Sequence, residues 1–138
     1  MTSRLFAYGT LQFPAILTAV TGLQLRGVDA TLRGYRCEGL RGEVYPAIMA
    51  ASTEQVRGIL YRGLSPAALM ALDRFEDDEY RRRVVTVITD DGREQQAWCY
   101  VIAPRWRRRL DGRRWDPEPF ERLHLAAYLR RLRRGKWE

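Results

Sequence analysis

"LFAYGTLQF" (residues 5–13) changes character at its centre. Four apolar or aromatic residues, which favour a strand, are followed by Gly9, Thr10, Leu11 and Gln12. Glycine is typical of a turn, because it lets the backbone approach a neighbour or a ligand closely. The stretch therefore predicts a strand that ends in a turn. Two roles are open for that turn: a structural one, with Tyr8 in the core, and a ligand-binding one.

Several other segments are rich in β-branched and aromatic residues and are separated by glycines or Asp-Gly. Strands are therefore predicted in "RGEVYPAIM" (41–49), "VRGILYRGL" (56–64), "RRVVTVIT" (82–89) and "QQAWCYVIA" (95–103), with one or two more in 23–35. Between the last two strands, Asp91-Gly92 favours a hairpin with a primed turn.

Helices are predicted where capping residues precede an apolar pattern. Residues 13–22 favour a short helix that ends at Gly22. Ser65 and Pro66 are suited to begin a second helix. Asp116 and Pro117 are suited to begin a C-terminal helix that ends at Gly135, with an apolar stripe formed by Leu125, Tyr128, Leu129 and Leu132.

Strands in runs with a few flanking helices predict an α+β fold with a sheet that curls or closes into a small mixed β-barrel. The 138 residues are expected to form a single domain, 1–138. Its C-terminal part (104–138) carries the whole net charge of +7, because acidic and basic residues balance over 1–103. Within this part, 104–117 is expected to be a flexible basic loop.

The composition excludes several classes of protein. Apolar residues make up 46% of the chain, so disorder is not expected. No apolar run approaches the roughly 20 residues of a membrane span, and no signal peptide is expected because "MTSRLFAYGT" (1–10) lacks an apolar run. The two cysteines and one histidine argue against a zinc site. A reduced, cytoplasmic protein is favoured over one with a Cys37–Cys99 disulfide.

Four motifs occur in order: "YGTL" (8–11), "YPAI" (45–48), "GILY" (58–61) and "LDRFEDDEYRRRVV" (72–85). In this order and spacing they resemble the gamma-glutamylcyclotransferase-like superfamily, which includes the avirulence-induced plant proteins. The resemblance covers about residues 4–102 and is carried chiefly by "YGTL" together with the pattern LDxFE…YxRxxV.

The resemblance implies an enzyme that releases 5-oxoproline from a gamma-glutamyl compound. In this reaction the substrate's own α-amino group attacks its γ-carbonyl and expels an amine, so neither an enzyme nucleophile nor a cofactor nor a metal is required. The partner it implies is therefore a small molecule. Its leaving group is open: an amino acid, a simple amine, a lysine side chain or part of a natural product.

Glu76 aligns with the family's catalytic glutamate and is the candidate for moving both protons. The C-terminal end of a helix, neighbouring acids and burial beside Phe75 all act to raise the pKa of such a carboxyl. Glu79 is the competing candidate, and a solvated surface acid is the structural alternative. The family often has glycine after this glutamate. Here Asp77 follows it, which leaves an altered substrate range or an inactive member as alternatives.

The family role of "YGTL" is to hold the substrate's α-carboxylate on backbone N–H groups, which assigns Tyr8, Gly9, Thr10 and Leu11 to substrate binding. Among the tyrosines, Tyr80 is the first choice for a further substrate contact. For Arg82 two roles are equally open: a contact to the substrate, or an ion pair with Asp73 or Glu76.

A binding module is the alternative function. Arginines alternate with Trp106 and Trp115 in 105–134, and Trp137 follows; this composition is typical of a nucleic-acid or acidic-partner contact. A solvated helix end and the attraction of anionic substrates are the other interpretations of the same charge.

Overall fold

Five strands close into a small mixed barrel in the computed structural model, which describes residues 2–135. The six-stranded sheet has the order β3-β1-β5-β4-β2-β6, and a pairing between β3 and β2 closes it. The β1–β5 pair is parallel and the other pairs are antiparallel. The strands are β1 (Ser3–Ala7), β2 (Gly27–Leu40), β3 (Pro46–Leu64), β4 (Tyr80–Thr89), β5 (Glu94–Ile102) and β6 (Leu110–Arg114). The prediction of an α+β fold with a closed sheet is confirmed.

The longest strand, β3, makes closure possible because it pairs along its length with β2 and, over its last residues, with β1. Gly58 lies where β3 meets β1: a Cβ at this position would stand 2.4 Å from the carbonyl oxygen of Ala7. Two separate strands, 41–49 and 56–64, were expected here. The structure has a single strand, and residues 41–45 precede it as a turn. The prediction of a strand from residue 41 is therefore wrong.

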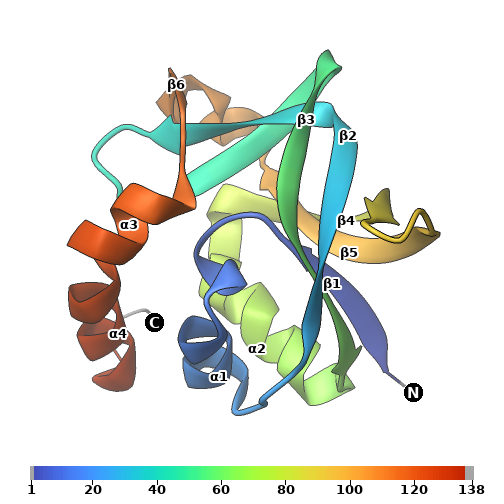
Figure 1. Cartoon of the computed structure of the whole chain (residues 1–138). Coiled ribbons are helices and arrows are strands. Elements are labelled where there is room, and N and C mark those ends of the chain that lie inside the picture. The colour runs from blue at the N-terminus through green and yellow to red at the C-terminus, as the bar shows by residue number, and fades with distance from the viewer. Residues whose placement is uncertain (1, 136–138) are drawn as a thin grey trace.

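Helices α1 (Pro14–Thr21), α2 (Pro66–Glu76) and α4 (Leu125–Arg133) gather on one side of the barrel, with α1 packed against both of the others (Figure 1). The predicted start of α2 is confirmed, because Ser65 Oγ accepts a hydrogen bond from the backbone N–H of Ala68 at 3.1 Å. Gly22 ends α1 in the left-handed conformation, as expected.

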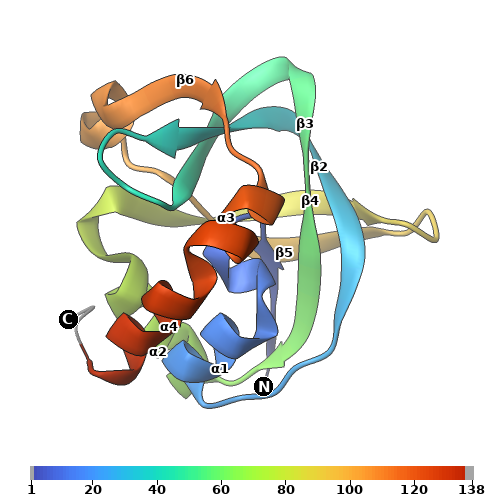
Figure 2. The same ribbon diagram turned by 60° about the vertical axis from the view of Figure 1, so that its left-hand side comes forward.

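The C-terminal helix is not continuous. It consists of α3 (Pro117–Leu123) and α4, which are separated by His124 at φ −128° and ψ −20°. The prediction of one helix is therefore wrong, and Asp116 makes no side-chain cap. Because of the break, α3 contributes Phe120 to the core, while α4 turns to pack beside α1 (Figure 2). The apolar stripe of α4 does face the core: Leu132 is buried and Leu125, Tyr128 and Leu129 pack against the same cluster.

Two other local predictions are corrected. Residues 104–117 are not an irregular loop: they include the 3-10 helix η3 (Pro104–Arg109) and strand β6, which pairs with β2. The β4–β5 hairpin is present, but its turn is not primed. Thr89 accepts a hydrogen bond from the N–H of Gly92, and Gly92 is left-handed while Asp91 is not. This is the pattern of a type I turn followed by a glycine bulge.

Cys37 and Cys99 are both free. No helix in the described part of the chain has the length and apolar character needed to cross a membrane.

Candidate active site

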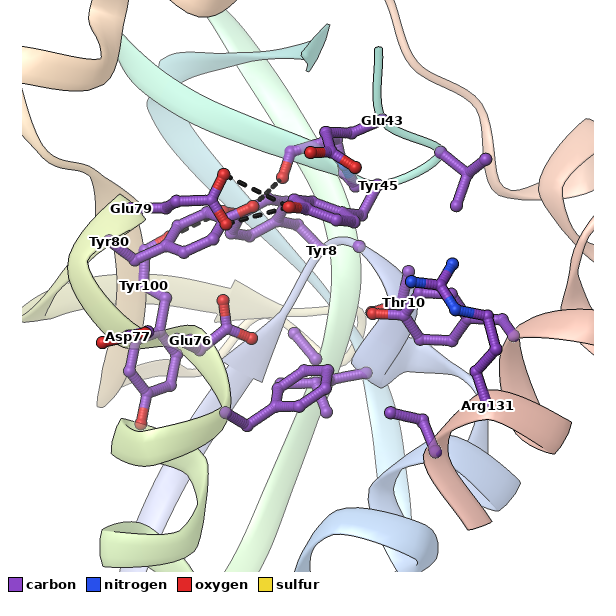
Figure 3. A pocket seen from close by; sticks show the side chains of 18 of the residues that line it. Tyr8, Thr10, Glu43, Tyr45, Glu76, Asp77, Glu79, Tyr80, Tyr100 and Arg131 are labelled. Carbon is purple, nitrogen blue, oxygen red and sulfur yellow. Dashed lines mark hydrogen bonds between the residues drawn. The ribbon is translucent and has the colours of Figure 1, made fainter. Parts of the chain in front are cut away.

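A cavity of about 380 Å³ lies between the end of β1, the turn before β3, the end of α2 and helix α4 (Figure 3). Its acidic lining comprises Glu43, Glu76, Asp77 and Glu79. Backbone and side chains of Tyr8, Gly9, Thr10 and Leu11 form part of the wall, together with Tyr45, Tyr80, Tyr100, Tyr128 and Arg131. The structure therefore brings "YGTL" and Glu76, which are far apart in the sequence, to the same cavity.

Glu76 is the last residue of α2, and its carboxyl points into the cavity (Figure 3). Burial raises its pKa from 4.5 to about 8, and the charge of Glu79 contributes to the rise. A carboxyl with this pKa exchanges its proton near neutral pH, as an acid–base catalyst must. Burial of the carboxyl therefore accounts for the main part of this tuning.

Asp77 follows at φ 54° and ψ −147°, and among the described residues it is the one non-glycine with positive φ. Such a conformation costs a residue with a Cβ on the order of 1–3 kcal/mol. The expectation that this position favours glycine therefore agrees with the backbone. The unusual turn takes the chain sharply out of α2 immediately after Glu76.

The loop after β1 is held in place by its neighbours. Gly9 packs directly on Pro46, because a Cβ at Gly9 would come within 2.9 Å of Pro46 Cγ. The Tyr8 hydroxyl donates to the carbonyl of Tyr100 at 2.6 Å, and Gln12 Nε2 donates to the carbonyl of Tyr8 at 2.6 Å. In the described part of the chain, the N–H groups of Gly9, Thr10 and Leu11 donate to no backbone acceptor. These N–H groups are therefore candidates for ligand binding.

Two tyrosine hydroxyls fix the part of the wall formed by Pro46 and Glu79. The Tyr45 hydroxyl donates to Glu79 at 2.9 Å, and the Tyr80 hydroxyl donates to the carbonyl of Pro46 at 2.5 Å. Burial raises the pKa of both hydroxyls, so they stay protonated as donors. Burial also raises the pKa of Glu79, while its hydrogen bond from Tyr45 opposes the rise.

Arg82 lies outside the lining of this cavity. Its Nε and Nη2 atoms donate to the two carboxylate oxygens of Asp73 at 2.8 and 3.1 Å, and its guanidinium stacks 4.2 Å from the ring centroid of Trp98. Asp73 also accepts from the Tyr100 hydroxyl at 2.8 Å. Of the two roles that the sequence left open, the geometry favours the ion pair with Asp73.

Sequence reasoning missed the contribution of α4, which brings Tyr128 and Arg131 to the cavity. Burial raises the pKa of the Tyr128 hydroxyl; the charge of Glu76 adds to this rise, and the side chain of Thr10 opposes it. The apolar stripe indicated which face of α4 is buried, but nothing in the run of arginines distinguished Arg131 from its neighbours.

The tryptophans of the basic segment pack against the protein. Trp115 donates to the carbonyl of Val44 at 2.9 Å and packs against Phe120 with the rings tilted by 46°. Trp106 is half-buried beside Arg109. Trp137 lies outside the described residues. Among those residues no group of three or more His, Cys, Asp or Glu side chains is placed to hold a metal ion.

A protein-family model described as gamma-glutamyl cyclotransferase, AIG2-like, matches residues 5–117. The chain belongs to this family. AIG2-like protein D of Arabidopsis thaliana is 32% identical over 127 residues, which span 91% of this chain and 83% of that protein. Protein AIG2 A of the same plant is 31% identical over 125 residues, which span 90% and 73%.

The family assignment agrees with the likeness to solved structures. A solution structure from Arabidopsis thaliana has a TM-score of 0.74 at 27% identity, and the match covers 98% of this chain and 82% of that one. A structure named gamma-glutamyl cyclotransferase has a TM-score of 0.66 at 16% identity, with coverage of 96% and 86%. The latter likeness extends to the fold alone. This chain thus shares its fold with the protein that is named gamma-glutamyl cyclotransferase.

Proposed function

We propose that this protein releases 5-oxoproline from a gamma-glutamyl compound by intramolecular aminolysis, with Glu76 as general acid and base. The observation that carries the proposal is the position of the Glu76 carboxyl. It faces the same cavity as the "YGTL" loop, and burial raises its pKa to about 8. The family assignment supports the reaction class, because it includes gamma-glutamyl cyclotransferases.

The loop at Gly9, Thr10 and Leu11 binds the α-carboxylate of the gamma-glutamyl group on backbone N–H groups. Holding that end folds the flexible chain so that its α-nitrogen approaches its γ-carbonyl, and ring closure then gains from proximity. Close packing of Gly9 on Pro46 keeps this loop in one arrangement.

Glu76 as carboxylate takes a proton from the substrate's α-ammonium. The freed nitrogen attacks the γ-carbonyl carbon, a new carbon–nitrogen bond forms, and the carbonyl electrons move to oxygen. When the carbonyl re-forms, the bond to the leaving nitrogen breaks and Glu76 returns a proton to that nitrogen. The ring nitrogen then releases its second proton to solvent, and the released amine takes up a proton from solvent. The products are 5-oxoproline and an ammonium ion, and Glu76 ends as the carboxylate in which it began.

The test is a screen of gamma-glutamyl amino acids, dipeptides and amines with detection of 5-oxoproline. The wild-type protein is expected to turn over at least one of them. Glu76→Gln is expected to lose on the order of a hundredfold or more in kcat, as general acid–base catalysts do. Asp78→Asn, an exposed acid two residues further on, is the matched control and is expected to retain activity.

Glu79→Gln separates the two candidate carboxyls. Because Glu79 is held by Tyr45, we expect this variant to keep far more activity than Glu76→Gln. Full activity in Glu76→Gln, with loss in Glu79→Gln, would reverse the assignment. Circular dichroism and urea unfolding establish that each variant is folded.

A further inference from the structure

Arg131 is the one cationic side chain among the described residues that line the cavity, and four acids line it as well. It extends from α4 on the side of the cavity opposite Glu76 (Figure 3). Among the described residues it forms no ion pair, whereas Glu43 has Arg109 at 3.9 Å. An arginine that faces a cavity without a carboxylate partner is suited to bind an anionic group of a ligand.

The depth of the lining residues indicates which part of the ligand this is. Tyr8, Thr10 and Leu11 are buried, whereas Arg131 is exposed, so we take Arg131 to mark the mouth of the cavity and the loop to mark its base. The reacting gamma-glutamyl group occupies the base, between the loop and Glu76, if the proposed function holds. The leaving group then extends toward the mouth, where Arg131 lies.

We propose that Arg131 binds a carboxylate on the leaving group, so that this protein prefers gamma-glutamyl amino acids or peptides to gamma-glutamyl amines. The inference rests on the proposed function, and it adds a specificity residue from α4. That helix lies beyond the segment that the family model matches, which ends at residue 117. Glu43 and Asp77 line the same cavity, so without Arg131 their negative charge would disfavour a ligand with a second carboxylate.

Two substrates isolate the contribution of the leaving-group carboxylate. They are gamma-glutamylalanine and gamma-glutamylethylamide, which differ only in that carboxylate. The wild-type protein is expected to prefer the first in kcat/KM. Arg131→Gln is expected to lower kcat/KM for gamma-glutamylalanine about tenfold, which is the low end for a charge-assisted contact at an exposed site. The same variant is expected to change kcat/KM for gamma-glutamylethylamide less than about twofold.

The matched control is Arg130→Gln, which makes the same charge change on the same helix at an exposed position outside the cavity lining. It is expected to leave both substrates unaffected. Arg131→Lys retains the charge and is expected to recover part of the preference. An equal loss on both substrates in Arg131→Gln would overturn the proposal, because Arg131 would then bind the α-carboxylate that both share. No loss on either would overturn it as well.

Binding measurements separate this proposal from the proposed function. Calorimetric titration of the full-length Glu76→Gln protein with the same two compounds reports affinity without turnover. Gamma-glutamylalanine is expected to bind more tightly than gamma-glutamylethylamide, and adding Arg131→Gln is expected to remove this difference in affinity. That result supports the role of Arg131 even if the wild-type protein turns over neither compound. Equal affinity for the two compounds overturns it even if the protein is an active cyclotransferase.

Discussion

The carboxyl of Glu76 couples protein stability to pH. The pKa of this carboxyl is about 8 in the folded protein and near 4.5 in the unfolded chain. Between these two pH values the folded state therefore retains a proton that the unfolded state loses. The resulting stabilisation is fully present below about pH 4.5 and is lost as pH rises through about 8. This group alone therefore lowers the free energy of unfolding by on the order of 5 kcal/mol across that window.

Glu76→Gln removes this dependence. We expect the variant to gain stability relative to the wild type as pH rises from 5 to 8, measured as the free energy of unfolding in urea at each pH. Glu121→Gln, on the exposed side of α3, is the matched control. A difference between Glu76→Gln and wild type that stays constant over the range would contradict the burial of the Glu76 carboxyl.

Asp77 holds a conformation that suits glycine. Replacing it with glycine relieves the backbone strain, which stabilises the folded state, and adds flexibility to the unfolded chain, which opposes that gain. Because the relief of strain is the larger effect, Asp77→Gly is expected to stabilise the protein by about 1 kcal/mol. Thermal or urea unfolding measures the change. Asp78→Gly is the control at a neighbouring residue without positive φ, and it is expected to destabilise. Destabilisation by both substitutions would show that Asp77 is not strained.

At the residue scale, the sequence led to the loop and to Glu76 because both belong to motifs with a recognisable order. Arg131 could not be predicted in this way. Arginines at 130, 131, 133 and 134 are equivalent in the sequence, and only the path of α4 past the barrel turns one of them toward the cavity. For Arg82, the choice between a substrate contact and an ion pair with Asp73 depended on where its side chain lies in space, which the spacing of residues in the sequence does not determine.

At the scale of elements, segments with strong local signals were predicted well and those governed by tertiary contacts were not. Ser65 and Gly22 mark the ends of their helices through hydrogen bonds or dihedral angles that act within a few residues. The continuity of β3 across 46–64 depends instead on two partner strands. The break at His124 lies within an apparently continuous helical pattern and lets Phe120 and Leu132 reach one core cluster.

The pair formed by Asp73 and Arg82 ties α2 to β4, and we expect it to act on stability rather than on substrate binding. A double-mutant cycle with Asp73→Asn and Arg82→Met is expected to give a coupling energy of about 1 kcal/mol, typical of a partly exposed bidentate pair. Urea unfolding measures the cycle. Arg82→Met is expected to keep KM within about threefold of the wild type, since a methionine side chain can still pack on Trp98. A large rise in KM at unchanged stability would instead assign Arg82 to the substrate.

On the scale of the whole molecule, the net charge of +7 lies entirely in the C-terminal part of the chain. Part of this charge flanks the cavity, since Arg109 neighbours Glu43 and Arg131 lies at the mouth. Anionic substrates are therefore expected to be attracted over a longer range than neutral ones. Packing of Trp106 and Trp115 against the protein leaves less aromatic surface for stacking on nucleic-acid bases.

The kinetic consequence is a salt effect that depends on substrate charge. For gamma-glutamylalanine, with one net negative charge, kcat/KM is expected to fall several-fold as ionic strength rises from about 0.02 to about 0.2 M, because screening shortens the range of the field. For gamma-glutamylethylamide, which has no net charge, little change is expected. Replacing the exposed Arg107 and Arg108 with glutamine should reduce the salt effect. An identical salt response for both substrates would exclude steering.

Construction of the cavity from two separate parts has an evolutionary consequence. The proposed proton-transfer group and the proposed α-carboxylate site are built on β1 and α2, which are joined to the barrel core, whereas the cavity mouth is completed by α4. Helix α4 follows the last strand and joins no sheet. The apolar side chains of α4 pack in the core, but Arg131 is exposed. Substitutions at such an exposed position can therefore change which amine is released at little cost to barrel closure. Descendants of such a chain can diversify in substrate while inheriting one reaction.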